Sequence, residues 1–542
     1  MGRRMTKVGL TAAGMLIAGL VGARVDAAPL PDGYREVGPD KVTAIRELCE
    51  ATAATGLFSG AVLVADGGEV IYQEAFGLAN REWMIPNTTD TKFRLASISK
   101  QFATMIVMQL VEEDRMDLDD TISDFLPYYR EDTGDRITIH HLMAHQSGLP
   151  DFTSNFDYRG KISRLPFDPD EFIREYCSGD LQNEPGTIYS YCNAGYVILG
   201  RIIEKVTRRT FEQNLKERIF DPLGMENSGF DRNESILEKR ASGYTRGPFD
   251  YTNADYLDMG ASPGAGGGLY STVEDMFLWD RALDTDQLLS AEFRELMFTP
   301  NRNVPEVEAA GGRPQSRYGY GWNIFTRTHP LTKHRTRVLN HGGAINGFRA
   351  MENRLVEEDA FIIVLCNQGD AFGSGEVWSV VVNLSSELIH IVTGQPYRMP
   401  VKPRPSQDQR LYAMVEKEGV EAAIKWFKEK GKKAAWGGTT MALAEKLIEE
   451  GRAAEGIQFM ELEIKLAPGK VWLLRKAADA CLSNGFPEKA LALAKQGLEQ
   501  KPEDERLQTL RDEAASFLAS ASSSFPAAGT SGGTGRMSTP GN

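Results

Sequence analysis

Residues 94–102 read Arg94-Leu95-Ala96-Ser97-Ile98-Ser99-Lys100-Gln101-Phe102, a Ser-x-x-Lys pair at the head of a long apolar run. The run from Phe102 to Val111 contains no Gly or Pro, and its apolar spacing predicts a mostly buried helix. Ser97 and Lys100 then fall in the first turn and share one helical face. A hydroxyl at a helix N-terminus lies among free backbone N–H groups, which stabilise an oxyanion. The competing interpretation is a Ser cap followed by an ordinary surface Lys.

Apolar runs on both sides of this helix predict a shared sheet. Gly60 to Ala65 and Val70 to Phe76 flank an Asp-Gly hairpin signal, and short β-branched runs return from Tyr318 to Phe325 and from Phe361 to Cys366. We therefore expect an α+β fold: an antiparallel sheet flanked by helices, with an inserted helical subdomain and a cleft where the two meet. Helices are also expected at 42–55, at 377–392 and from about 197, and a further strand is expected at 337–339.

Length and composition exclude several classes of protein. With 542 residues, 42% of them hydrophobic, the chain is too long for one core and should form two or more domains. Its formal net charge of −14 would repel nucleic acids and anionic membranes, so neither is an expected partner. The cysteines are odd in number and lack metal spacing, so we expect no disulfide framework and at most one bridge. They are Cys49, Cys177, Cys192, Cys366 and Cys481. For the chain as a whole we expect no metal and no cofactor.

The first residues carry an export signal. Basic residues in the first seven positions precede a weakly apolar stretch from Val8 to Ala23, and small residues follow at Ala27 and Ala28. This order predicts a signal peptide over residues 1–27 and a periplasmic or secreted protein with no stable membrane span after processing. A retained anchor is the alternative, and both general and twin-arginine export stay open.

The C-terminal part differs in composition from the rest. Residues 396–406 are Pro-rich and predict a stiff linker, whereas 407–518 are rich in Ala, Leu, Glu and Lys. Two glycines, Gly451 and Gly485, stand 34 residues apart in the sequence, as a tetratricopeptide-like helical module requires. Such a module could bind a protein partner, and a generic helical bundle is the alternative. Residues 519–542 are mostly small and polar and predict a disordered tail.

Two further motifs supply candidate partners for Ser97. Tyr191 and Asn193 form a Tyr-x-Asn motif after a Pro-Gly turn, just before an apolar helix, whereas the second Tyr-x-Asn, at Tyr251, lies in a run without periodicity and is discounted. His341 and Gly343 form the chain's His-x-Gly motif, after the strand expected at 337–339. Glycine there allows close approach to the backbone, and a strand edge offers unpaired N–H groups.

In this order, Ser-x-x-Lys, Tyr-x-Asn and His-x-Gly resemble the serine β-lactamase-related family, which includes class C β-lactamases, D-alanyl-D-alanine peptidases and family VIII esterases. The resemblance covers about residues 40–395, and it implies a β-lactamase/transpeptidase-like serine hydrolase domain. Accessory segments agree; they are 142–150 (LMAHQSGLP), 221–225 (DPLGM), 267–272 (GGLYST) and 318–322 (YGYGW).

The resemblance implies a role for each motif residue. Ser97 would be the nucleophile that forms an acyl-enzyme, and Lys100 and Tyr191 would share the proton transfers, with either as the base. Asn193 would orient Lys100 and the substrate amide. The N–H groups of Ser97 and Ala344 would form the oxyanion hole.

His341 departs from the Lys that β-lactamases of this family carry at that position. Since His is largely neutral near pH 7, this favours an esterase or peptidase that acts on a carboxylic ester, small peptide or amide. The alternatives are a D-alanyl-D-alanine peptidase or β-lactamase, and a catalytically silent scaffold whose function is binding through the repeats. The intact motifs argue against the scaffold.

Three other features are weighed and set aside. Cys192 is interpreted as a packed residue and not as a second nucleophile. A Gly-x-Ser-x-Gly at 260–264 lacks the flanking strand and helix of a nucleophile elbow. His141 and His145 lack a third ligand for zinc.

Overall fold

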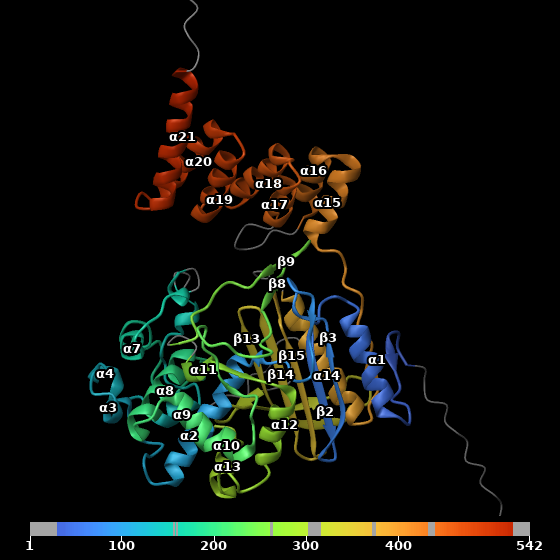
Figure 1. Cartoon of the computed structure of the whole chain (residues 1–542), viewed down its shortest axis with the longest axis vertical. Helices are drawn as coiled ribbons and strands as arrows, with labels where there is room; N and C mark the ends of the chain where they lie inside the picture. The colour runs from blue at the N-terminus through green and yellow to red at the C-terminus, as the bar shows by residue number, and fades with distance from the viewer. Residues whose placement is uncertain are drawn as a thin grey trace, which may run out of the picture.

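The computed structural model describes residues 30–154, 158, 161–260, 264–301, 316–370, 375–431 and 440–523. The predicted signal peptide, 1–27, and the centre of the Gly-x-Ser-x-Gly motif, 261–263, lie outside the described residues. Figure 1 shows a large domain built around a sheet and, beyond it, a smaller group of helices formed by the C-terminal part of the chain.

A seven-stranded antiparallel sheet forms the centre of the large domain, in the order β11-β12-β13-β14-β15-β2-β3 (Figure 1). The pairing of β15 with β2 joins the first and last thirds of the domain, which confirms the prediction of one shared sheet. The predicted hairpin is β2 with β3. The strands are β2 Gly60–Asp66, β3 Glu69–Phe76, β11 Ser316–Tyr318, β12 Asn323–Thr328, β13 Arg335–Ile345, β14 Phe348–Leu355 and β15 Ala360–Cys366.

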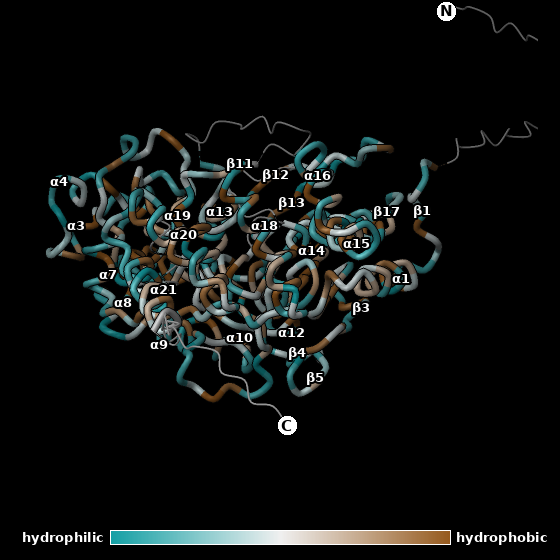
Figure 2. Tube along the Cα trace, turned by 90° about the horizontal axis from the view of Figure 1, so that it is seen from above, coloured by the Kyte–Doolittle hydropathy of each residue, from teal (hydrophilic) through white to brown (hydrophobic). Residues whose placement is uncertain are grey.

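Both faces of this sheet are covered, because the side chains on both faces of the central strands are apolar. Along β2, Val62 and Val64 pack with helices α1 (Lys41–Ala53) and α14 (Glu376–Val392). Ala61 and Leu63 point the other way, into the core shared with the helical subdomain. Figure 2 shows brown, hydrophobic stretches towards the middle of the molecule and mostly teal loops around its outline.

The helical subdomain is inserted between the two parts of the sheet, as predicted. Its helices are η1 Ala96–Ile98, α2 Ser99–Glu112, α3 Ile122–Phe125, α4 Glu131–Gly134, α5 Ile139–Met143, η2 Phe152–Ser154, η3 Ile162–Arg164, α7 Pro169–Tyr176, α8 Asn193–Thr207, α9 Phe211–Leu215, the π-helix η4 Lys216–Phe220, α10 Asp221–Leu223, α11 Gly264–Gly267, α12 Val273–Ala282 and α13 Ala291–Met297. Short strands form small sheets beside it: β4 Leu78–Asn80 with β5 Ile85–Pro86; β6 Phe93–Arg94, β10 Leu269–Ser271 and β7 Gly229–Phe230; β16 Gln368–Asp370, β8 Tyr244–Arg246 and β9 Tyr251–Asn253.

Three predicted elements have different bounds. The strand expected over 318–325 is two strands, separated by a turn in which Gly321 has a left-handed φ of 79°. The helix expected near 197 begins at Asn193, and the strand expected at 337–339 continues to Ile345. Continuation of that strand through a Gly pair goes against local propensity and is imposed by pairing with β14.

The C-terminal part is helical throughout its described residues. The helices are α15 Gln407–Glu418, α16 Val420–Lys430, α17 Met441–Glu449, α18 Ala453–Leu466, α19 Val471–Ser483, α20 Pro487–Gln500 and α21 Glu505–Ser523. Helix α15 packs against α16 and α17, α16 and α17 each pack against α18, and from α18 to α21 each helix packs against the next. Their assignment as tetratricopeptide-like repeats stays a prediction. Residues 519–523 belong to α21, so the predicted disordered tail does not begin at 519, and residues 524–542 of that tail lie outside the described residues. The start of the predicted linker also belongs to the large domain, since β17 (Tyr397–Arg398) pairs with β1 (Tyr34–Arg35).

The described helices include none that is both long enough and apolar enough to cross a membrane. All five cysteines are buried and free, so the single disulfide that the sequence allowed does not form.

Candidate functional site

Ser97 lies in the 3-10 turn η1, which runs directly into α2, so the turn predicted to carry Ser97 is a tighter 3-10 turn at the head of the helix. Lys100 is the second residue of α2 and is fully buried. The Lys100 Nζ lies 3.3 Å from the Ser97 Oγ, as expected for residues on one helical face. Ala96, just before the serine, has a left-handed φ of 50°, an unfavourable conformation for Ala that the packed surroundings must hold.

The Lys100 amine has three neighbours within hydrogen-bonding distance. Besides Ser97, its Nζ donates to the Asn193 Oδ1 at 2.9 Å and to the Gly266 carbonyl oxygen at 2.7 Å. These two oxygens can only accept, so a neutral amine directs both its N–H bonds to them and its lone pair towards the Ser97 hydroxyl. Burial lowers the Lys100 pKa to about 7, against the opposing attraction of Asp151. A large fraction of Lys100 is therefore neutral at physiological pH.

Tyr191 stands on the loop before α8, with the Lys100 Nζ 5.0 Å from its ring centroid. Burial raises the Tyr191 pKa above its ordinary value, although a hydrogen bond with the Ser97 hydroxyl opposes that shift. Tyr191 is therefore protonated wherever Lys100 is titrating, and it can donate a proton. Cys192, between Tyr191 and Asn193, is buried with a pKa raised to about 11, which fits a packed residue and not a nucleophile.

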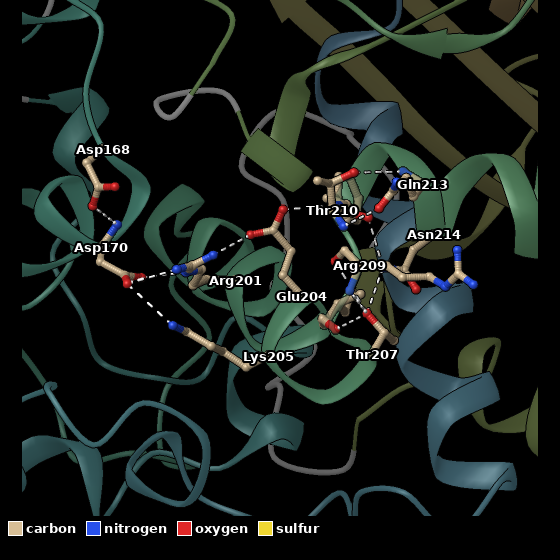
Figure 3. A network of polar contacts seen from close by, with 12 residues as sticks. Asp168, Asp170, Arg201, Glu204, Lys205, Thr207, Arg209, Thr210, Gln213 and Asn214 are labelled. Atoms are coloured by element: carbon tan, nitrogen blue, oxygen red, sulfur yellow. Dashed lines mark hydrogen bonds and ion pairs between the residues drawn. The ribbon is translucent and has the colours of Figure 1, made fainter.

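Asn193 is the first residue of α8, and a polar network holds that helix in place (Figure 3). Arg201 of α8 bonds to Asp170 of α7 and, at 2.8 Å, to Glu204 one turn on. Glu204 in turn accepts the backbone N–H of Phe211 at the start of α9. These contacts tie α8 to two neighbouring helices, so the Asn193 amide is presented by a fixed element.

Strand β13 brings the third motif to Ser97. Its pairing with β12 ends at Asn340, so the segment from His341 to Ile345 has β14 on one side only and packs against η1 on the other. A Cβ at Gly343 would lie 2.1 Å from the Leu95 carbonyl oxygen, so only glycine permits this approach. Ala344 follows on the open edge and is exposed. Backbone N–H groups of such an edge are suited to an oxyanion.

His341 is buried and neutral. Its Nδ1 lies 2.7 Å from the Gly342 carbonyl oxygen, which can only accept, so Nδ1 carries the hydrogen. The Nε2 is then free to accept the hydrogen bond of the Tyr318 hydroxyl at 3.0 Å. Burial, with Lys100 nearby, lowers the His341 pKa to about 3. The position therefore supplies no positive charge, in agreement with the expectation from the sequence.

Two residues of the site escaped the motif search, although both belong to or adjoin the accessory segment 142–150. His145 is buried, and its Nδ1 accepts the Cys192 backbone N–H at 3.1 Å. Its ring lies 4.2 Å from that of Tyr191 between centroids, so it supports the tyrosine. Asp151 accepts the Asn193 amide N–H at 3.1 Å. The signal available in the sequence was that the polar residue Asp151 directly follows this segment.

The structure gives no support to metal binding at the two histidines considered from the sequence. His141 lies in α5 and accepts the Thr138 backbone N–H, whereas His145 lies beyond the end of α5. Among the described residues, no three His, Cys, Asp or Glu side chains gather as a metal site requires.

Comparisons with known proteins point the same way. The family model described as Beta-lactamase matches residues 44–384, which include every motif residue above. The chain is 28% identical over 377 residues to Penicillin-binding protein 4* of Bacillus subtilis, covering 66% of this chain and 78% of that protein. It is 29% identical over 339 residues to the D-aminopeptidase of Brucella anthropi, covering 60% and 59%.

Among solved structures, the D-amino acid amidase of Ochrobactrum anthropi SV3 in complex with L-phenylalanine amide is similar, at 26% identity. The TM-score is 0.55, and the match covers 65% of this chain and 97% of that one. The penicillin-binding protein of Bacillus halodurans matches at 25% identity and a TM-score of 0.52, over 64% of this chain and all of that one.

Proposed function

The chain belongs to the beta-lactamase family and is a serine hydrolase of that kind, and we propose that it hydrolyses a carboxylic ester or a small peptide or amide. The observation that carries the proposal is the Lys100 amine, held by two carbonyl oxygens with its lone pair directed at the Ser97 hydroxyl.

In the proposed reaction, neutral Lys100 takes the Ser97 proton as the Oγ attacks the substrate carbonyl carbon. The carbonyl oxygen becomes an oxyanion, which the N–H groups of Ser97 and Ala344 stabilise. The tetrahedral intermediate collapses, its bond to the leaving group breaks, and Tyr191 donates the proton that the leaving group needs. Lys100 returns a proton to the Tyr191 oxygen. Water then attacks the acyl carbon and loses a proton to the same residues. The bond from that carbon to the Ser97 Oγ breaks, the Oγ takes the proton back, and the acid is released.

The neutral His341 supports an ester or amide over a β-lactam. A β-lactam carries a carboxylate that a neighbouring ammonium would bind, whereas a neutral imidazole offers it no opposite charge. The relatives named as a D-aminopeptidase and a D-amino acid amidase support the amide class. Those named penicillin-binding proteins support acylation by a β-lactam as the second candidate.

Turnover of three substrates by the chain from residue 28 onward, with Ser97→Ala beside it, tests the proposal. Release of nitrophenol from p-nitrophenyl butyrate, or of nitroaniline from D-phenylalanine p-nitroanilide, should depend on Ser97, and nitrocefin should be hydrolysed more slowly. Faster hydrolysis of nitrocefin than of the ester and the anilide would indicate β-lactam hydrolysis instead. A folded protein that turns over none of the three would contradict it.

A periplasmic or secreted location, with residues 1–27 removed, is part of the same proposal and rests on the order of basic, apolar and small residues. N-terminal sequencing of the protein from its native cell fraction checks it. A protein partner for the C-terminal helices stays a prediction.

A further inference from the structure

The Asp151 carboxylate lies beside the Lys100 site, and the reaction above does not use it. It accepts the Asn193 Nδ2–H, with distances of 3.1 Å to Oδ2 and 3.4 Å to Oδ1. It also accepts the Thr153 backbone N–H at 3.2 Å and the Thr153 hydroxyl at 2.8 Å. Asp151 therefore links its own turn, η2, to the N-terminus of α8.

This contact selects one orientation of the Asn193 amide. A carboxylate can only accept, so it binds the NH2 end of the amide and leaves the Oδ1 end for the Lys100 Nζ, 2.9 Å away. In the reverse orientation the NH2 group would face the amine, where it would compete with the Ser97 hydroxyl for the Lys100 lone pair.

We propose that Asp151 is a positioning residue, which fixes the Asn193 amide and thereby aims the Lys100 lone pair at Ser97. The inference rests on the proposed function, since it takes Lys100 as the base.

The segment that carries Asp151 is itself anchored. Phe152 is buried, with its ring 4.8 Å from that of Tyr158 and 5.2 Å from that of Phe172 between centroids. The Asp151 carbonyl oxygen accepts both the backbone N–H and the hydroxyl of Ser154. The carboxylate is therefore held in place before any substrate binds, as orientation of a catalytic group requires.

The charge of Asp151 should also affect a second measurable quantity, the pKa of Lys100. Its attraction for the ammonium raises the pKa of Lys100 against the effect of burial. The other titratable groups that face Lys100 are Cys192, Tyr191, Tyr196, His145 and His341. His145 and His341 have lowered pKa values and are neutral. Burial raises the pKa values of Cys192, Tyr191 and Tyr196, so these groups are neutral near pH 7 as well. Asp151 is then the negative charge that opposes deprotonation of Lys100.

A purely structural role would be to cap η2, and the chain offers a matched control for that role. Asp168 accepts the backbone N–H groups of Asp170 and Glu171 at the start of α7, at 2.9 and 3.1 Å (Figure 3). It makes the same kind of cap without contacting Asn193 or Lys100.

Steady-state kinetics against pH on the full chain test the proposal with Asp151→Asn and Asp168→Asn. Asp151→Asn should lower kcat about tenfold or more, change KM less than about twofold, and move the acid limb of kcat/KM down by about half a pH unit or more. Asp168→Asn should leave kcat and the limb unchanged. The exchange variant Asp151→Asn/Asn193→Asp places the carboxylate on the amine and should move the limb above that of the wild type.

An Asp151→Asn variant with an unshifted limb, and no more loss of kcat than Asp168→Asn, would overturn the proposal. Absence of Ser97-dependent turnover in the wild type would contradict the proposed function instead. In that case the role of Asp151 can still be tested by measuring the Lys100 pKa in a 13C NMR titration of lysine-labelled protein. The Lys100 signal is assigned as the one that is missing from Lys100→Arg. A lower Lys100 pKa in Asp151→Asn supports the proposal, and an unchanged one overturns it.

Discussion

At the scale of single residues, the site depends on a lysine that folding makes a weaker base. Lys100 is fully buried, and among the described residues no carboxylate bonds directly to its Nζ, which donates to the Asn193 and Gly266 oxygens. Desolvation therefore outweighs the attraction of Asp151, and the Lys100 pKa falls to about 7. The Ser-x-x-Lys spacing was enough to predict the pair itself. Asp151 adjoins an accessory segment, but its contact with Asn193 could not be predicted, because folding alone brings together residues that lie 42 positions apart in the chain.

The pH dependence of the reaction follows from this pKa. Since the neutral amine is the active form, kcat/KM should rise with pH, with a midpoint near the Lys100 pKa of about 7. The raised pKa of Tyr191 should keep the plateau above pH 9. Initial rates on p-nitrophenyl butyrate in constant-ionic-strength buffers check it. The Lys100→Arg variant should have a kcat/KM about 10²-fold or more below that of the wild type. An acid limb near pH 4 in the wild-type profile would point to a carboxylate base instead.

The same pKa makes stability depend on pH. The pKa of Lys100 is lower in the folded state than its ordinary value of 10.5, so the unfolded state binds more protons between about pH 7 and 10.5. The destabilisation by Lys100 is absent above pH 10.5 and grows as the pH falls towards 7. The unfolding free energy of Lys100→Met relative to wild type should therefore change by a few kcal/mol across that interval. Urea titrations at each pH measure it, and a constant difference would contradict a buried, titrating Lys100.

At the scale of elements, the site is the junction of η1, α8 and β13. Hairpin and helix signals predicted β2, β3, α1 and α14 well, because turn residues and the spacing of apolar residues depend only on neighbouring positions in the sequence. The full extent of β13 was not predictable, because a Gly pair disfavours a strand and only pairing with β14 overrides that preference. The two-strand arrangement at 316–328 was missed because a glycine turn interrupts an aromatic alternation.

Gly343→Ala tests how closely β13 must approach η1. The new Cβ would meet the Leu95 carbonyl oxygen at 2.1 Å, so β13 must move away from Ser97 by about 1 Å. A displacement of that size should lower kcat about 10²-fold with a smaller effect on KM. Gly38→Ala is the control, since a Cβ there meets nothing within 4 Å. Equal activity of the two variants would show that the β13 edge takes no part in catalysis.

At the scale of the whole molecule, the C-terminal helices contact the large domain through the β8–β9 hairpin (Figure 1). The ring of Phe249, at the hairpin tip, lies 5.5 Å from that of Tyr412 in α15 between centroids, and Gln409 donates to the Pro248 carbonyl oxygen. Composition predicted the change from one domain to the next. It could not predict this contact, which joins segments about 160 residues apart.

Phe249→Ala should loosen that contact without affecting chemistry. An aromatic pair contributes about 1 kcal/mol, so thermolysin should cleave near the exposed Val401 a few times faster. Ester turnover should stay unchanged. Phe517→Ala, which removes an exposed aromatic side chain of α21, should leave both rates alone. Gel densitometry over time measures cleavage, and equal rates in both variants would show that the hairpin contact does not hold the helices.

Intact-mass labelling with a fluorophosphonate at several pH values, followed by peptide mapping, tests whether Ser97 and Lys100 act as nucleophile and base. We expect one adduct per chain, on Ser97, absent from Ser97→Ala, with a labelling rate that rises through about pH 7 as Lys100 loses its proton. An adduct on another residue, or no adduct on a folded protein, would contradict the assignment of Ser97 and Lys100 as nucleophile and base.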